Sequence, residues 1–161
     1  MDNFLVAASN LYACRAIHKA INKKEYLDVM ILLNAMTASI VYHTLEVSKH
    51  NMTGIPMYQH RELRALNFDR VSAALVVARF VYRYRSNINK RVIVFGITGV
   101  GCLMLSECQH VIDTSRYPIQ PMKVFYMITH IAWHIFAFHT AHLLLKKTKK
   151  TTKKGKNYSE Q

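Results

Sequence analysis

Two short motifs in the sequence place imidazole groups at helical spacing. His130 and His134 are four residues apart, and Ser39 and His43 have the same separation, so each pair shares one face if its segment is helical. Two imidazoles spaced in this way on one helix can bind a single metal ion. Asp69 lies at the start of the apolar segment that follows Ser39 and His43, and it adds a carboxylate that could transfer protons. These residue types point to a metal site with an acid–base group beside it.

The candidate residues lie in long apolar segments of the length that a membrane-spanning helix needs. A hydrocarbon core of about 30 Å requires about 20 mostly apolar residues. Four segments approach this length, at residues 26–47, 68–84, 92–105 and 124–145. The segment 124–145 has no formal charge and is the best of them, whereas a fifth, 4–17, is interrupted by Arg15. The fifth segment either spans the membrane or lies in its interface as an amphipathic helix.

These segments predict an all-α fold, a polytopic membrane helix bundle over residues 1–145. It has about five transmembrane helices, or four if the first helix lies in the interface. The chain has 161 residues and a formal net charge of +13, and 51% of its residues are hydrophobic. This composition excludes a disordered chain, a secreted disulfide scaffold and an acidic soluble enzyme. Five Gly and three Pro are too few for a turn-rich β protein.

The basic residues predict the orientation of the bundle. They gather in three regions that share one side if all five segments span: Lys19, Lys23 and Lys24; Arg83, Arg85, Lys90 and Arg91; and the tail 146–161, which has seven Lys and one Glu. The positive-inside rule makes that side cytosolic. We therefore expect an N-terminus that is outside or lumenal and a basic, disordered cytosolic tail over 146–161. A nucleic-acid partner is not expected, because no basic face with interleaved aromatic residues or reading motif is present.

This topology places the candidate residues at a similar depth in the membrane. The topology itself was derived from the loop charges alone, without reference to these residues. Ser39 and His43 come at the outer end of one span, Asp69 at the outer end of the next, and His130 and His134 in the outer half of the last. Three neutral imidazoles with one open position form the arrangement of a catalytic zinc site, in which a bound water is activated. Asp69 could then move protons, and Ser39 could donate a hydrogen bond to a developing oxyanion.

The ordered motifs resemble those of a superfamily of membrane metal-dependent hydrolases. It contains the alkaline ceramidases, the adiponectin/progestin-type receptors and the related GPI-lipid-remodelling proteins. Ser39-Ile-Val-Tyr-His43 is similar to the family's first motif, Asn67-Phe-Asp69 to its second, and His130-Ile-Ala-Trp133-His134 to its third. The resemblance extends in order over about residues 26–145, and this sequence looks like a short, divergent member.

The resemblance implies an integral membrane zinc-dependent hydrolase that cleaves an amide or ester bond in a sphingolipid-like or other acyl lipid. It implies that His43, His130 and His134 bind Zn²⁺, that Asp69 handles protons and that Ser39 assists near the activated water. The family typically has seven spans, and some ceramidases have an acidic calcium site near the N-terminus that this chain lacks. With five spans, a homo-oligomer would supply the missing wall of a lipid pocket.

Several polar residues near these motifs are reserve or structural candidates. Ser106-x-x-x-His110 repeats the serine–histidine spacing, which makes His110 a reserve ligand. Glu46 follows His43 by three residues and is a reserve carboxylate. His139 and His142 lie about 180° and about 120° from His130 around the helix, so we predict that they are structural.

Two other functions are compatible with the sequence. A non-catalytic receptor-like or scaffold protein could retain the fold and the metal. A haem-binding membrane protein could use histidines at equal depth on two helices, such as His43 and His130. The haem hypothesis does not explain Asp69 or Ser39.

Overall fold

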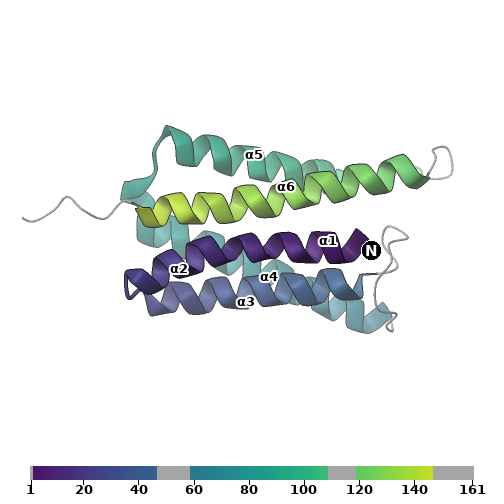
Figure 1. The fold of residues 1–161 in the computed structure, drawn as a ribbon, viewed down its shortest axis with the longest axis horizontal. Helices are drawn as coiled ribbons and strands as arrows, with labels where there is room; N and C mark the ends of the chain where they lie inside the picture. Colours follow the sequence, from purple (N-terminus) through teal and green to yellow (C-terminus); the bar gives the residue numbers. More distant parts are fainter. Residues whose placement is uncertain (1, 47–58, 109–118, 147–161) are drawn as a thin grey trace, which may run out of the picture.

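The computed structural model describes residues 2–46, 59–108 and 119–146, and within these residues the protein is all-α. The helices are α1 (Asp2–Ser9), η1 (Asn10–Ala13), α2 (Cys14–Asn22), α3 (Tyr26–Leu45), α4 (Gln59–Tyr84), η2 (Arg85–Asn87), α5 (Lys90–Cys108) and α6 (Ile119–Lys146). Because α1, η1 and α2 follow one another without a gap, the described chain forms five helical rods (Figure 1). The predicted all-α fold is confirmed. The predicted tail lies outside the described residues apart from Lys146.

The first rod, α1–η1–α2, lies lengthwise in the bundle beside α3 and α6 (Figure 1). Val6, Ala13 and Ala20 are buried at successive positions along it. The first apolar segment was predicted either to span the membrane or to lie in its interface. Its position alongside α3 and α6 resembles the first of these arrangements. The rod also begins earlier and ends later than the apolar stretch 4–17, because its polar ends continue the helix.

A backbone motif ends α2 and turns the chain into α3. Lys24 adopts a left-handed conformation with φ of 60°. Its amide donates to the Ile21 carbonyl at 2.8 Å, and the amide of Glu25 donates to the Ala20 carbonyl at 3.0 Å. These are the two hydrogen bonds of a Schellman motif, which satisfies the last carbonyls of a helix. The tight turn makes α3 run antiparallel to the first rod.

A side-chain cap begins α5. The Oδ1 atom of Asn89 accepts hydrogen bonds from the backbone amides of Arg91 at 3.0 Å and Val92 at 3.2 Å. Such a cap satisfies amides that have no partner within the helix. The preceding turn is fixed to the end of α6, because the side-chain Nδ2 of Asn87 donates to the Leu144 carbonyl at 3.0 Å.

The three basic regions predicted to share one side do meet at one end of the bundle, as far as the structure describes them. The turn between α2 and α3, the connection between α4 and α5, and the last residue of α6 lie together (Figure 1). Arg83 Nη2 lies 3.2 Å from Glu25 Oε1 across this end. The helices therefore alternate in direction as expected, and we call this the basic end.

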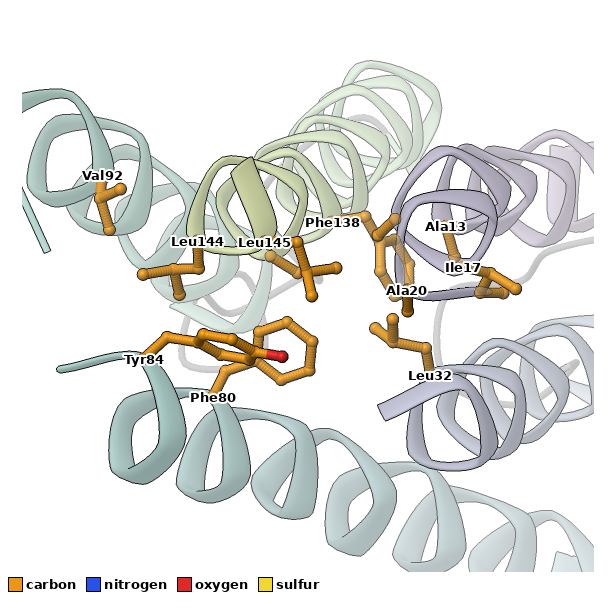
Figure 2. Packing of buried hydrophobic residues seen from close by; sticks show 12 residues of the cluster. Ala13, Ile17, Ala20, Leu32, Phe80, Tyr84, Val92, Phe138, Leu144 and Leu145 are labelled. Atoms are coloured by element: carbon orange, nitrogen blue, oxygen red, sulfur yellow. The ribbon is translucent and has the colours of Figure 1, made fainter. Parts of the chain in front are cut away.

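An apolar core fills the half of the bundle next to the basic end. It is built from side chains of α2, α3, α4, α5 and α6 together with η1 (Figure 2): Ala13, Ala16, Ile17, Ala20, Leu32, Phe80, Tyr84, Val92, Phe138, Ala141, Leu144 and Leu145. The alanines of the first rod let its backbone approach its neighbours closely. Toward the other end, the buried residues are mostly polar, so the two halves of the bundle differ in character.

A buried ion pair joins α3 to α4 in the apolar half. Arg79 Nε lies 2.7 Å from Asp28 Oδ1, and the Tyr84 hydroxyl donates to the other carboxylate oxygen. Asp28 is fully buried, and the Arg79 side chain is 22% exposed. Removing one partner of a buried pair is costly because it leaves a charge without compensation.

We expect Asp28→Asn to lower the free energy of unfolding by about 3 kcal/mol, measured by thermal or denaturant unfolding in detergent. The control is Glu25→Gln, which removes the more exposed pair with Arg83 and should cost less than about 1 kcal/mol. Equal losses in the two variants would show that burial of the Asp28–Arg79 pair does not matter.

The helices pack unevenly, and this leaves space inside the bundle. α5 lies closely along α6, where a Cβ atom added to Gly99 would be 3.2 Å from the Phe136 Cβ. α4 packs mainly on α3 and has little contact with α6. α4 and α5 therefore diverge after the short connection between them.

The outward faces of the rods are strongly apolar. Large hydrophobic side chains are exposed on every rod, including Phe4, Met30, Val71, Ile97, Met104 and Ile128, of which Met30 and Ile97 are each 68% exposed. By length and composition, one helix of the described chain, α3, could cross a membrane, a property that some core helices of soluble proteins share. α6 was expected to be the best span, but its four histidines lower its mean hydropathy.

Candidate metal centre

Three buried imidazoles gather in the polar half of the bundle. His43 comes from α3, and His130 and His134 come from α6. Their ring centroids are 4.7 Å apart for His43 and His130, 5.2 Å for His43 and His134, and 4.9 Å for His130 and His134. One potential ligand atom from each lies within 4.8 Å of the other two, so the group could hold a metal ion. We call these residues the histidine triad.

The first rod positions the triad, because α1 and η1 pack against both α3 and α6. α3 and α6 have little direct contact with each other. Their imidazoles therefore meet in the space that the first rod maintains between the two helices. On α6, the spacing of four residues points both histidines in the same direction.

The Nδ1 atom of each imidazole in the triad lies within hydrogen-bond distance of a different side chain. His43 Nδ1 lies 3.0 Å from Glu46 Oε2, and His130 Nδ1 lies 3.2 Å from Ser106 Oγ. His134 Nδ1 lies 2.7 Å from Ser9 Oγ. Metal-binding histidines typically have such partners at the ring nitrogen that faces away from the metal.

Sequence reasoning missed two of these partners. Ser106 forms, by its spacing, a second serine–histidine pair with His110, a residue that lies outside the described part of the chain. Ser9 is 125 positions from His134, so no spacing rule connects the two residues. Only Glu46, within one turn of His43, had a signal in the sequence.

Glu46 is a structural partner of the triad and does not face open space. It is fully buried, and the Tyr42 hydroxyl donates to its Oε1 atom at 2.8 Å. The Tyr126 hydroxyl lies 3.1 Å from Oε2. Surrounded by donors, the carboxylate acts as an acceptor that fixes the His43 ring.

The Nε2 atom of His43 is buried, and no hydrogen-bonding group among the described residues reaches it. A buried polar atom without a partner is rare and calls for an explanation. Zinc binds neutral imidazole nitrogen at about 2.0–2.1 Å. The candidate ligand nitrogens of the triad lie within 4.8 Å of one another. The triad therefore could hold a metal ion, and neutral imidazoles are among the ligands that zinc accepts.

Ser39 and Asp69, the two residues predicted to act beside the metal, adjoin the triad. Ser39 Oγ lies 3.3 Å from His134 Nε2. The Asp69 carboxylate accepts a hydrogen bond from the Ser39 side chain, so the hydroxyl lies between the carboxylate and the imidazole. The structure thus brings together all five residues that the motifs singled out, from α3, α4 and α6.

An elongated cavity of about 690 Å³ leads away from this centre between α4 and α5. Ser39, Asp69 and His134 line one end of it, and Ile88 and Leu144 line the other, near the basic end. From His134 to Leu144 the cavity follows about 15 Å of α6. Most of its walls are aliphatic or aromatic, and Gly96 and Gly101 form part of the α5 side.

The other histidines of α6 do not join the triad. His139 Nδ1 lies 3.2 Å from the Tyr12 hydroxyl. His142 Nδ1 lies 3.3 Å from the Arg15 carbonyl oxygen. Both contacts are with the first rod, as expected of residues that stabilise packing.

Fold and site together define an all-helical bundle with a buried three-histidine group. No family model matches the chain, and no solved structure matches it. The chain is similar to "Uncharacterized protein L282" of Acanthamoeba polyphaga mimivirus, with 29% identity over 153 residues. The match covers 91% of this chain and 97% of that protein. The similarity thus extends along nearly the whole of both chains.

Proposed function

We propose that this protein is an integral membrane zinc-dependent hydrolase that cleaves an amide or ester bond in a lipid. The observation that carries the proposal is the buried histidine triad, with Ser39 and Asp69 beside it, at one end of an apolar cavity. The resemblance of the same residues to the motifs of a membrane hydrolase superfamily supports this function.

The distribution of side chains supports a membrane location. Large apolar side chains cover the outside of every rod, whereas Asn3, Asp28 and Glu46 are fully buried. An exposed apolar area of this extent marks contact with a membrane or a partner. Polar groups within membrane helices face the interior and mark functional sites. The proposed orientation has the basic end in the cytosol and the triad in the outer or lumenal half.

The residues around the triad suggest how a lipid bond would be cleaved. A zinc ion held by His43, His130 and His134 would supply a Lewis acid that activates water for attack. In this proposal, an Asp69 carboxylate oxygen accepts a proton from the attacking water and later delivers it to the leaving nitrogen or oxygen. The Ser39 hydroxyl donates a hydrogen bond to the scissile carbonyl oxygen as negative charge develops there.

The cavity supports a lipid as the substrate. Its volume of about 690 Å³ lies within the range of 300–1,000 Å³ that is typical of small-molecule sites. Its apolar walls suit an acyl chain, and each buried methylene contributes about 0.8 kcal/mol. Its polar end, with Ser39, Asp69 and His134, would then face the bond that joins the chain to the rest of the lipid.

The ring contacts within the triad argue against haem binding. The His43 and His130 rings are in edge contact, with centroids 4.7 Å apart. A haem with these residues as its two axial ligands would need the macrocycle between them. Rings in contact leave no space for it, so a single ion is the better fit.

The proposal is tested with the purified protein in proteoliposomes and two fluorescent long-chain substrates, an N-acyl amide and the corresponding ester. We expect turnover of at least one substrate, loss of that turnover after chelation, and recovery when Zn²⁺ is restored. Turnover that is insensitive to chelation, or zinc-loaded protein that cleaves neither substrate, would contradict the proposed activity.

In the same assay, Gly101→Leu tests the cavity as the route of the acyl chain. Gly101 lines the cavity, and a Cβ atom there would have no neighbour within 4 Å. The variant should fold and bind zinc normally but lose turnover of long chains while retaining turnover of short ones. An equal effect on both chain lengths would contradict this route.

A further inference from the structure

We propose that three basic side chains between α2 and α6, at the basic end of the bundle, bind the phosphate of one anionic phospholipid in the cytosolic leaflet. Arg15 and Lys19 of α2 and Lys146 of α6 supply the positive charges, and we call these residues the basic cluster. The inference rests on the membrane location proposed above. It uses neither the metal centre nor the hydrolysis, so it can fail while they stand.

The first rod and α6 pack in a constant register near the basic end. The Tyr12 hydroxyl lies 3.2 Å from His139 Nδ1. One turn further on, the Arg15 carbonyl accepts a hydrogen bond from His142 Nδ1 at 3.3 Å. In both pairs the two residues are 127 positions apart, because the two rods run in the same direction toward the basic end (Figure 1).

Lys19 and Lys146 continue this register at the next turn. They too are 127 positions apart, as Arg15 and His142 are, so the register places the two lysines opposite each other. The charges of the basic cluster all act on His142, which confirms that they gather around one point. Within the described residues, no carboxylate lies within salt-bridge distance of the cluster. Like charges repel, and an anion between the helices would turn this repulsion into attraction.

The Arg15 guanidinium is held in place by Tyr12. Its Nη1 donates to the Tyr12 hydroxyl at 2.8 Å, and its Cζ lies 5.3 Å from the centre of the Tyr12 ring. A guanidinium has five N–H donors in a rigid fork that matches the oxygens of a phosphate. Tyr12 takes one of these donors, so the others can bind two phosphate oxygens.

The position of the basic cluster suits the headgroup of a lipid. Lys146 ends α6 and Lys19 lies in the last turn of α2, at the end that is cytosolic in the proposed orientation. The α6 face that carries His139 and His142 continues toward the bilayer centre as Ile135, which is 38% exposed. Basic sites between membrane helices on the cytosolic side bind anionic headgroups. An acyl chain would therefore lie along the apolar surface while its phosphate meets the cluster.

The test is native mass spectrometry of the delipidated full chain in detergent, titrated with phosphatidylglycerol, whose only charge is on its phosphate. We expect one tightly bound molecule per chain, and binding of phosphatidylcholine with the same acyl chains that is weaker by about 10-fold or more. Inorganic phosphate at the same concentration should not displace the lipid. Equal binding of the two lipids, or displacement by inorganic phosphate, would overturn the proposal. Neither zinc nor turnover enters the measurement.

The double variant Lys19→Gln/Lys146→Gln removes the two facing charges and leaves the hydrogen bonds of Tyr12, Arg15 and His142 in place. It should weaken phosphatidylglycerol binding by about 25-fold, at about fivefold for each basic residue near an anionic headgroup. Without lipid, this variant should unfold at a higher temperature than the wild type, because the repulsion is removed. A lower unfolding temperature would show that the lysines serve the packing, and would overturn the assignment.

The matched control is Arg85→Gln/Lys90→Gln, which removes two exposed charges from the α4–α5 connection at the same end of the bundle. Because charges that lie beyond a Debye length are largely screened, binding should change by less than about threefold. Arg15→Lys keeps the charge but not the fork, and should weaken binding by about 10-fold, the loss of one charged hydrogen bond. An equal loss in the two double variants would show a general attraction to the basic end and would refute a specific site.

Discussion

His134→Ala should abolish stoichiometric zinc binding, because it removes one of three ligands and leaves two imidazoles on different helices. The loss of affinity should exceed the roughly 100-fold upper range for outer partners of a metal site. Metal content and competition titration of the detergent-purified protein measure it. Zinc should also raise the thermal stability of the wild type, by about 2.7 kcal/mol at 100 times its dissociation constant, and should not stabilise the variant.

The matched control is His139→Ala, a histidine of the same helix that bonds Tyr12 and not the triad. We expect about one zinc per chain in this variant, as in the wild type. Equal zinc content in His134→Ala and the wild type would exclude the triad as the metal site. Equal loss in the two histidine variants would point instead to general misfolding of α6.

Asp69→Asn should lower lipid hydrolysis by about 10²- to 10⁴-fold, the usual contribution of a positioned acid–base group. Asparagine has nearly the same shape and can still accept the hydrogen bond from Ser39, but it cannot hold the transferred proton. Turnover of the amide and ester substrates in proteoliposomes measures the effect, and zinc content should remain at the wild-type level.

A conservative change elsewhere at the same end provides the control. Glu107 is a partly exposed acid of α5, 3.6 Å from Arg70, and has no place in the proposed chemistry. Glu107→Gln should retain the wild-type rate. A wild type that binds zinc but hydrolyses no faster than Asp69→Asn would favour the non-catalytic receptor-like or scaffold function.

The helical segments could be predicted from the apolar pattern, but their ends could not. α4 begins at Gln59, nine residues before the apolar stretch that starts at Phe68, and α6 begins at Ile119, five residues before Val124. Apolar runs mark only the part of a helix that faces a core or a membrane. Polar turns extend a helix through backbone hydrogen bonds, and a hydropathy pattern carries no information about these bonds.

That these five residues would lie near one another could be predicted, because each has a local signature. A spacing of four residues puts two side chains on one helix face, and alternating segment directions put three segment ends at the same depth. These rules applied to His43, His130 and His134 as well as to Ser39 and Asp69. They identified the residues of the centre without showing which atoms face one another.

The sequence by itself determined an all-helical chain, the alternation of its helices and the histidine, serine and aspartate residues that could share one site. Only the tertiary structure decided that Ser9 and Ser106 hold His134 and His130, and that a cavity opens between α4 and α5. The physical reason is the distance along the chain over which each kind of interaction acts. Helical periodicity relates residues within a few turns, whereas contacts between distant segments depend on how closely whole helices pack, which small residues such as Gly99 set.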